Sequence, residues 1–304
     1  MKLLPVILCI FLLAACSPAA IPPTVTPVPT SRPSPTVSTD CAAGTHVNQI
    51  ASGEEVRQYR LYIPASYQPA HPTALVFGFH GNTGYADQFE SYSGFSLVAE
   101  REGYIVVYPQ GAGEHPSWDT HPGSKDVKFV RDLIAHLETI CNIDPLRIYA
   151  TGHSLGGGMV NRLACDLSDR IAAIGPVSGA YQNANDCSPS QPVAVIAVHG
   201  TADTVIFYLG IPPHGTVLET YTVIGTPIPQ WASAWAGRNG CDNKSTIIFN
   251  QDPISAQQWP NCRNGADVVF YTIRGGEHNW PTPAEHLDAA QTIWDFFVKH
   301  PLVQ

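Results

Sequence analysis

Short, uninterrupted apolar runs alternate along the chain with segments in which apolar residues recur three and four positions apart. The runs are typical of strands buried on both faces, and the wider spacing is typical of a helix with one buried face. Residues 126–141 carry the helical spacing, and residues 284–298 are predicted to form the last helix, with Leu287, Ile293 and Trp294 in the core. The predicted strands are residues 74–79, 104–108, 147–151, 172–177, 193–198 and 268–273.

This alternation begins near residue 56 and predicts an α/β fold, with a mostly parallel central sheet and helices on both of its faces. The sequence shows no internal repeat, so residues 41–304 are expected to form one domain. A composition of 44% apolar residues is sufficient for a large core. Only 13% of residues are charged, and 27 prolines and 25 glycines argue against a coiled coil or a helical bundle.

Charge and the length of the apolar runs each argue against one kind of partner, nucleic acid and a spanned membrane. The net charge is −9 and the lysines and arginines form no cluster, whereas nucleic-acid binding needs a basic surface for the phosphates. No apolar run reaches the roughly 18 residues that a membrane-spanning helix needs. We therefore expect no nucleic-acid partner, and contact with a membrane only through a lipid anchor.

The N-terminal residues predict export. Residues 1–15 are typical of a secretory signal, with Lys2 ahead of a short apolar stretch. The stretch ends in Leu13-Ala14-Ala15-Cys16, which resembles a bacterial lipobox and would make an acylated Cys16 the first residue of the mature protein. Ordinary cleavage near the same place, with release, is the alternative. We expect an exported bacterial protein that is extracellular or anchored at the cell surface.

Residues 16–40 are predicted to be a linker. Between positions 17 and 39 lie seven prolines and nine serines or threonines, and nothing that could form a core. Such a segment behaves as an extended spacer, which at about 3.1 Å per residue could hold a domain about 70 Å from a membrane. A passive linker with no requirement for reach is the alternative.

The cysteines agree with export. An even number in an exported chain predicts disulfides, here three, and the spacing leaves fifteen pairings open. Neither C-x-x-C nor H-E-x-x-H occurs, so we expect no metal site, and no motif calls for a cofactor. Apart from Cys9 in the signal and Cys16, the cysteines are Cys41, Cys141, Cys165, Cys187, Cys241 and Cys262.

A candidate nucleophile lies in the sequence Gly-His-Ser-Leu-Gly at residues 152–156, between a predicted strand and the helical residues 159–164. A G-x-S-x-G pattern in this context predicts a nucleophile elbow, a strained turn that needs small glycines because the helix packs close to the sheet. The serine of the pattern is Ser154. A serine hydroxyl needs a base to take its proton and an acid to orient that base.

The base and the acid are expected in the order serine, acid, histidine along the chain. Asp203 follows the strand 193–198, and His278 follows the strand 268–273, so both lie at the carboxyl edge of the predicted sheet. Asp242 or Asp252 could replace Asp203 as the acid.

The other histidines fit the catalytic role less well. His153 is expected to point away from the site, and His199 is expected to support the loop of the acid. His80 is expected to be a structural brace, and His136 a surface residue.

The reaction also needs donors for the developing oxyanion. The backbone N–H of Leu155, directly after the nucleophile, is one candidate. The loop at residues 79–84 is expected to supply the other, from Asn82 or, as the runner-up, from Thr83.

Together, the segments 152–156, 199–203 and 275–281 resemble the secreted α/β-hydrolase esterases grouped as feruloyl esterases and polyhydroxybutyrate depolymerases. Residues 107–111 and 162–165 are also similar to that group, and the resemblance covers roughly the whole predicted domain. It implies an α/β-hydrolase fold in which the candidate serine, acid and histidine form a catalytic triad.

The resemblance also implies a disulfide pairing, namely Cys41–Cys141, Cys165–Cys187 and Cys241–Cys262. The chain departs from the group in two places. Glu277 stands where the group often has a glycine, and the stretch 204–230 after the acid is longer than expected.

The predicted connection between strands 172–177 and 193–198 is too short for a large lid, which favours an open site and a bulky or polymeric ester. The stretch 204–230 is expected to form a flap instead. Trp118, Tyr208 and Trp280 are candidates to stack on an aromatic acyl group or a sugar.

The leading hypothesis is a monomeric serine esterase of the feruloyl or acetyl-xylan type, which acts on plant polysaccharide esters through an acyl-serine intermediate. A polyester depolymerase with an open apolar groove is the alternative, and an inactive surface-binding lipoprotein is the alternative from another class. A catalytic histidine must be neutral, so the rate should fall below about pH 6.5.

Overall fold

The computed structural model describes residues 41–181, 186–210 and 226–303. The predicted signal, the anchor at Cys16 and the linker up to residue 40 lie outside the described residues. Residues 211–225, the central part of the predicted flap, also lie outside them. All described residues belong to one compact unit that spans residues 35–304.

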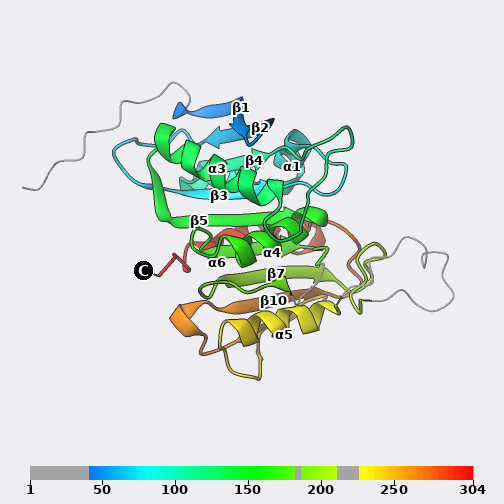
Figure 1. The fold of residues 1–304 in the computed structure, drawn as a ribbon. Helices are drawn as coiled ribbons and strands as arrows, with labels where there is room; N and C mark the ends of the chain where they lie inside the picture. Colours follow the sequence, from blue (N-terminus) through cyan, green and yellow to red (C-terminus); the bar gives the residue numbers. More distant parts are fainter. Residues whose placement is uncertain (1–40, 182–185, 211–225, 304) are drawn as a thin grey trace, which may run out of the picture. The chain divides into compact units, whose positions relative to one another are not determined.

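One sheet of ten strands runs through the described residues (Figure 1). Its central strands are almost entirely buried, as their continuous apolar runs predict. The strands are β1 (Gly44–Ser52), β2 (Glu55–Ile63), β3 (Thr73–Phe79), β4 (Ile105–Pro109), β5 (Ile143–His153), β6 (Ala173–Val177), β7 (Ala194–Gly200), β8 (Thr246–Gln251), β9 (Ile254–Trp259) and β10 (Val268–Ile273).

The strands follow the order β1-β2-β4-β3-β5-β6-β7-β10-β9-β8 across the sheet. The strands from β4 to β10 in this order are parallel to one another, and antiparallel strands flank them at both edges. The carboxyl ends of β5, β7 and β10 therefore share one edge of the sheet. The loops that carry the candidate serine, acid and histidine leave from these three ends.

Helices cover both faces of the sheet and enclose two hydrophobic cores (Figure 1). Core residues of α3, α4 and α5 lie on one face, and those of α1, α2 and α6 on the other. The helices are α1 (Ala86–Ser93), α2 (Phe95–Glu102), α3 (Lys125–Ile140), α4 (Leu155–Asp166), α5 (Ile228–Arg238) and α6 (Ala289–Phe297).

The six predicted strands and the helix at 126–141 are confirmed. The last helix begins later than predicted, at Ala289, because Pro283–Glu285 forms a separate 3-10 turn that ends at His286 with a φ of 71°. Asp288 then caps the helix by accepting the N–H of Gln291. The three predicted core residues of this segment are buried.

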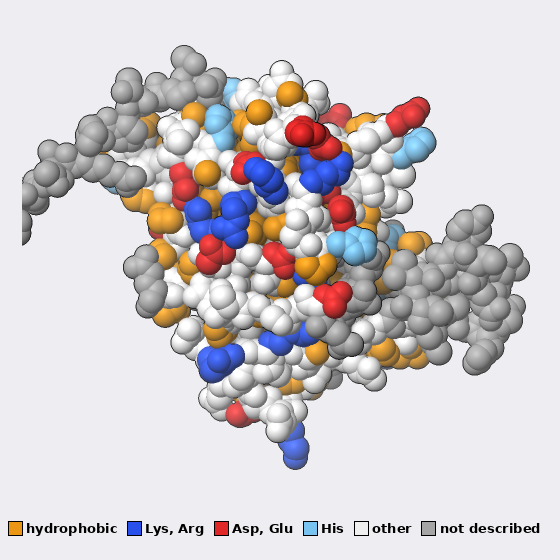
Figure 2. Space-filling model, viewed as in Figure 1, with side chains coloured by type: hydrophobic (Ala, Val, Ile, Leu, Met, Phe, Trp, Pro, Cys, Tyr) orange, Lys and Arg blue, Asp and Glu red, His pale blue; other side chains and the backbone are white. Residues whose placement is uncertain are grey.

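Three disulfides join Cys41 to Cys141, Cys165 to Cys187 and Cys241 to Cys262, which confirms the pairing that the resemblance implies. The first ties the start of the described chain to the residue after α3. Figure 2 shows lysines and arginines interspersed with aspartates and glutamates on the face in view. Within the described ranges, no helix is both long and apolar enough to cross a membrane.

Candidate active site

Ser154 lies on the sharp turn between β5 and α4, with φ 56° and ψ −120°. The flanking glycines are required by close packing. A Cβ on Gly156 would stand 2.2 Å from the carbonyl oxygen of Phe79, and one on Gly152 would stand 2.5 Å from the backbone of Gly156. The backbone is therefore held in the conformation of a nucleophile elbow, as the sequence predicts.

Asp203 lies on the loop after β7, and its side chain is fully buried. One carboxylate oxygen, Oδ1, accepts the backbone N–H groups of Val205 at 2.9 Å and Ile206 at 2.8 Å. These two bonds fix the orientation of the carboxylate, because both donors belong to its own loop. The other oxygen, Oδ2, is left for side chains.

Two histidines approach Oδ2 of Asp203. Nδ1 of His278 lies 2.8 Å from it, and Nε2 of His199 lies 3.2 Å from it. Burial acts to raise the pKa of the Asp203 carboxyl, but the hydrogen bonds from His199 and His278 outweigh it and hold that pKa well below its usual range. Asp203 is therefore ionised over the whole pH range in which a histidine changes its protonation state.

The two alternative acids lie elsewhere. Asp242 and Asp252 are both exposed. Asp242 accepts a hydrogen bond from Asn261, and Asp252 pairs with Arg274. Neither of these contacts involves a histidine.

His278 lies on the loop after β10, and its side chain is 17% exposed. The ring of His153 lies beside it, with centroids 5.0 Å apart, so the expectation that His153 points away is wrong. Because Ser154 directly follows His153, this contact brings the elbow and His278 to one place. In the part of the chain that the structure describes, no hydrogen bond joins the Ser154 hydroxyl to His278.

The buried His153 makes stability depend on pH. Burial, and then the nearby His278, lower the pKa of His153 to about 3. The unfolded chain binds this proton near pH 6.5, so stability is lost as the pH falls from about 6.5 toward 3. We expect His153→Leu to remove this loss and to gain about 2 kcal/mol relative to the wild type between pH 7 and pH 4.5.

Urea unfolding at the two pH values measures the effect. His71→Leu is the matched control, because His71 is exposed and its hydrogen bonds among the described residues use only its backbone. If both variants lose as much stability as the wild type on acidification, His153 does not carry the proton linkage.

The loop at residues 79–84 lies against the elbow, since a Cβ on Gly81 would stand 3.4 Å from Cβ of Ser154. His80 braces this loop, as expected. Its Nε2 accepts the N–H of Gly111 at 2.9 Å, and its Nδ1 lies 2.7 Å from the carbonyl oxygen of Gly81. Burial lowers the pKa of His80, which fits a neutral structural role.

The backbone donors separate the two candidates in this loop. The N–H of Thr83 donates to the carbonyl of Pro116 at 2.8 Å, so it is already engaged. The N–H groups of Asn82 and Leu155 have no acceptor among the described residues. Both remain open to a ligand oxygen near Ser154, which favours Asn82 over Thr83.

The three aromatic candidates for substrate stacking pack into the protein. Trp118 is 4% exposed and donates its N–H to the carbonyl of His80, and Trp280 is 6% exposed and donates to Ser93. Tyr208 is half-buried, and its hydroxyl lies 3.2 Å from a threonine hydroxyl of β10. Because both tryptophans are almost fully buried, neither has a ring face free for stacking, and we do not propose them as substrate contacts.

A groove of about 650 Å³, which no sequence motif predicts, adjoins the 79–84 loop. Pro116, which accepts the N–H of Thr83, lines it, and so does Tyr85, which is 46% exposed. Other lining residues are polar, among them Gln58, Gln110 and Lys125.

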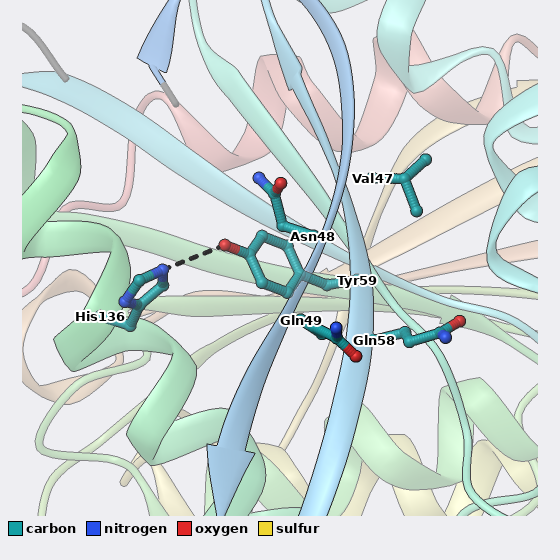
Figure 3. Close-up of a pocket in the computed structure, with 6 residues that line it drawn as sticks. All are labelled: Val47, Asn48, Gln49, Gln58, Tyr59 and His136. Atoms are coloured by element: carbon teal, nitrogen blue, oxygen red, sulfur yellow. Dashed lines mark hydrogen bonds between the residues drawn. The ribbon is translucent and has the colours of Figure 1, made fainter. Parts of the chain in front are cut away.

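A second cavity, of about 450 Å³, lies between β1, β2 and α3 (Figure 3). His136 lines it with its Nε2 3.1 Å from the hydroxyl of Tyr59. The other lining residues are Val47, Asn48, Gln49 and Gln58, so the described lining holds no nucleophile and no carboxylate. We therefore place the candidate site at the elbow and not here.

The chain resembles known proteins both in sequence and in structure. A model of the family described as Esterase PHB depolymerase matches residues 57–211. Feruloyl esterase B of Piromyces equi is 31% identical over 237 residues, which cover 73% of this chain and 42% of that protein. Feruloyl esterase C of Emericella nidulans is 31% identical over 260 residues, which cover 83% of this chain and 86% of that protein. The chain thus spans less than half of the first relative's length.

Among solved structures, an acetyl xylan esterase from Aspergillus awamori has a similar fold, with a TM-score of 0.61 and 17% identity. The alignment covers 83% of this chain and 99% of that one. At this identity the likeness concerns the fold alone, and it confirms the α/β-hydrolase fold. As predicted, the connection between β6, which ends at Val177, and β7, which begins at Ala194, is too short to hold a large lid domain.

Proposed function

We propose that this chain, which belongs to the family described as Esterase PHB depolymerase, is a serine esterase that cleaves feruloyl or acetyl esters of plant polysaccharide. One observation carries the proposal. A buried, ionised Asp203 holds Nδ1 of His278 at 2.8 Å, beside a serine on a strained elbow. The same arrangement of acid, histidine and serine performs acyl transfer on several unrelated folds.

The proposed mechanism follows from the hydrogen bonds. Because Asp203 accepts the Nδ1 proton of His278, the lone pair lies on Nε2 and can take the proton of the Ser154 hydroxyl. The serine oxygen attacks the ester carbonyl, and the N–H groups of Leu155 and Asn82 hold the oxyanion. His278 then protonates the leaving alcohol. In the second half of the reaction, His278 takes a proton from water, and the water oxygen attacks the acyl carbonyl. His278 then returns the proton to the Ser154 oxygen as the acid product leaves.

The short β6–β7 connection, which leaves no room for a large lid, and the adjoining groove support the proposed substrate class. Relatives named as feruloyl esterases and a structural neighbour named as an acetyl xylan esterase support it. The family description favours a polyester depolymerase as the second candidate. The amide and charged side chains in the groove match a hydroxylated polymer better than an apolar polyester.

The proposed location is outside the cell, with a lipid anchor at Cys16. Three disulfides support export, because such bonds persist in oxidising compartments. The anchor rests on the lipobox-like sequence before Cys16. We propose a monomer without a cofactor, since the mechanism uses only side chains and backbone of one chain.

The direct test incubates purified protein with methyl ferulate, acetylated xylan and polyhydroxybutyrate films in parallel. We expect release of ferulate or acetate, and little release of hydroxybutyrate. Release from the film alone would replace the proposed substrate with the second candidate. A protein that cleaves none of the three is not the proposed esterase.

Tyr85 tests the groove. Stacking of an exposed aromatic ring on a sugar contributes about 1 kcal/mol, so Tyr85→Ala should raise KM about fivefold for acetylated xylan oligomers. The rise for methyl ferulate should be smaller, because that ester carries no sugar. Leu97→Ala is the matched control, since Leu97 is 71% exposed on α2. An equal change for both esters would exclude the groove as a sugar site.

A further inference from the structure

The carboxylate of Asp203 is unusual in the number of its donors. Two backbone N–H groups bind Oδ1, and two histidines, His199 and His278, share Oδ2. A triad acid needs only the bond to its catalytic histidine. The second histidine on the same oxygen therefore calls for a role of its own.

We propose that His199 is a positioning residue, which acts through Asp203 and sets how strongly the carboxylate holds the proton of His278. This inference rests on the proposed function. His199 leaves from β7, four positions before the acid, and its side chain is fully buried. Among the described residues, its side-chain hydrogen bond, ion pair and ring contact are with Ile206, Asp203 and Tyr208 and not with the elbow.

The hydrogen-bond partners of His199 decide which of its two ring nitrogens carries the hydrogen. Its Nε2 lies 3.2 Å from Oδ2 of Asp203 and 2.9 Å from the carbonyl oxygen of Ile206. An ionised carboxylate and a carbonyl can only accept, so Nε2 carries the hydrogen and donates. The other nitrogen, Nδ1, is buried without a partner among the described residues. A proton on Nδ1 would find no acceptor there, so His199 serves as a fixed donor.

A donor draws negative charge from the oxygen it binds. With His199 in place, Oδ2 divides its acceptor strength between two N–H groups. Without the His199 donor, Oδ2 accepts a hydrogen bond from His278 alone and stabilises the imidazolium form of His278 more strongly. Removal of the His199 donor should therefore move the titration of His278 to higher pH. A residue that only supported the loop would act oppositely, because a displaced Asp203 holds His278 less firmly.

Few other groups could produce such a shift. His153 faces His278 from the end of β5, and its pKa of about 3 keeps it neutral over the range. Tyr92, on α1, lies near His153, and burial raises its pKa. Tyr208 lies 6.2 Å from the ring of His199, and Glu277 precedes His278 on an exposed loop. Of these groups, only His153 receives an electrostatic contribution from His199, and that contribution is the smallest of the causes that act on the pKa of His153.

Three substitutions of one residue test the proposal. His199→Phe keeps the ring but removes the donor, and His199→Asn keeps a polar side chain whose amide is too short to reach Oδ2. His199→Gln carries an amide N–H at about the position of imidazole Nε2 and should restore the bond. His136→Phe is the matched control, because His136 also donates or accepts through Nε2 but lies at the distant cavity.

The readout is the titration of His278, followed by NMR, together with kcat/KM for methyl ferulate against pH. We expect the Phe and Asn variants to move both midpoints upward by about half a pH unit to one unit. The Gln variant and the control should stay at the wild-type value. If Phe does not fold, Asn and Gln decide the question.

An unchanged or lowered midpoint in folded Phe or Asn variants, or a Gln variant that behaves like them, would overturn the role of His199. The NMR titration does not depend on turnover. A wild-type protein that cleaves no ester would therefore refute the proposed function, while the titration would still decide whether His199 tunes His278.

Discussion

Ser154→Ala should lower kcat for methyl ferulate by at least about 10⁴-fold, because loss of the nucleophile removes the acyl-enzyme route altogether. The remaining rate would come only from binding and from the oxyanion donors. Folding should be unchanged. Alanine has the same backbone requirements as serine at the φ of 56°, and the neighbouring glycines that permit the turn are kept.

The variant is purified beside Ser245→Ala, whose hydroxyl bonds to Gln257 on the β8–β9 hairpin, away from the elbow. Thermal unfolding and circular dichroism establish that both variants are folded. Ester cleavage by folded Ser154→Ala at the wild-type rate would remove the serine mechanism. In that case a group other than Ser154 would carry the cleavage, whereas a wild type that cleaves no ester at all would belong to the non-catalytic, surface-binding class that the sequence leaves open.

The sequence predicted the elements that position the site because those elements carry the simplest patterns. The strands β3, β5, β7 and β10 are buried on both faces, so their apolar runs are continuous. Strands of one parallel sheet end at a common edge, so the chain order alone places Asp203 and His278 near the elbow. The pairing of Asp203 with His278 follows from topology more than from any local motif.

The direction of the His153 side chain could not be predicted in the same way. It depends on how the chain turns into the elbow at φ 56°, which the G-x-S-x-G pattern does not specify in detail. The burial of Trp118 and Trp280 depends on helices and loops distant in the chain. Aromatic residues near a motif suggest a platform for substrate stacking. In the structure, however, the indole N–H groups of both tryptophans donate to backbone carbonyls inside the protein, those of His80 and Ser93.

The edge strand β8 was missed for a related reason. All six residues of β8 are exposed, so the strand has no buried face and no hydrophobic alternation to detect. The strand exists because β9 pairs with it, and β9 in turn pairs with β10. Such tertiary pairing overrides the local pattern.

Asp203→Asn should lower kcat by about 10⁴-fold, the loss that follows when the histidine of a triad is held in the wrong tautomer. The hydrogen bonds of Asp203 explain why an amide cannot replace the carboxylate. All four of its contacts, with Val205, Ile206, His199 and His278, use it as the acceptor. An amide has one accepting oxygen and one donating nitrogen.

Either orientation of the amide therefore fails. If its oxygen takes the place of Oδ1, the NH₂ group faces two histidine N–H groups. His278 then relieves the conflict by moving its proton from Nδ1 to Nε2, where it can no longer accept the proton of Ser154. If its oxygen takes the place of Oδ2, the NH₂ group faces the backbone donors of Val205 and Ile206, and the loop itself is destabilised.

The matched controls are Asp242→Asn and Asp252→Asn, the two other carboxylates that the sequence allows as the acid. Both are exposed and contact no histidine through the bonds described above, so we expect kcat within about twofold of the wild type. The comparison uses methyl ferulate and folded proteins of equal thermal stability. A large loss in either control, with Asp203→Asn still active, would reassign the acid. That result would also remove the proposed role of His199, because that role acts on His278 through Asp203.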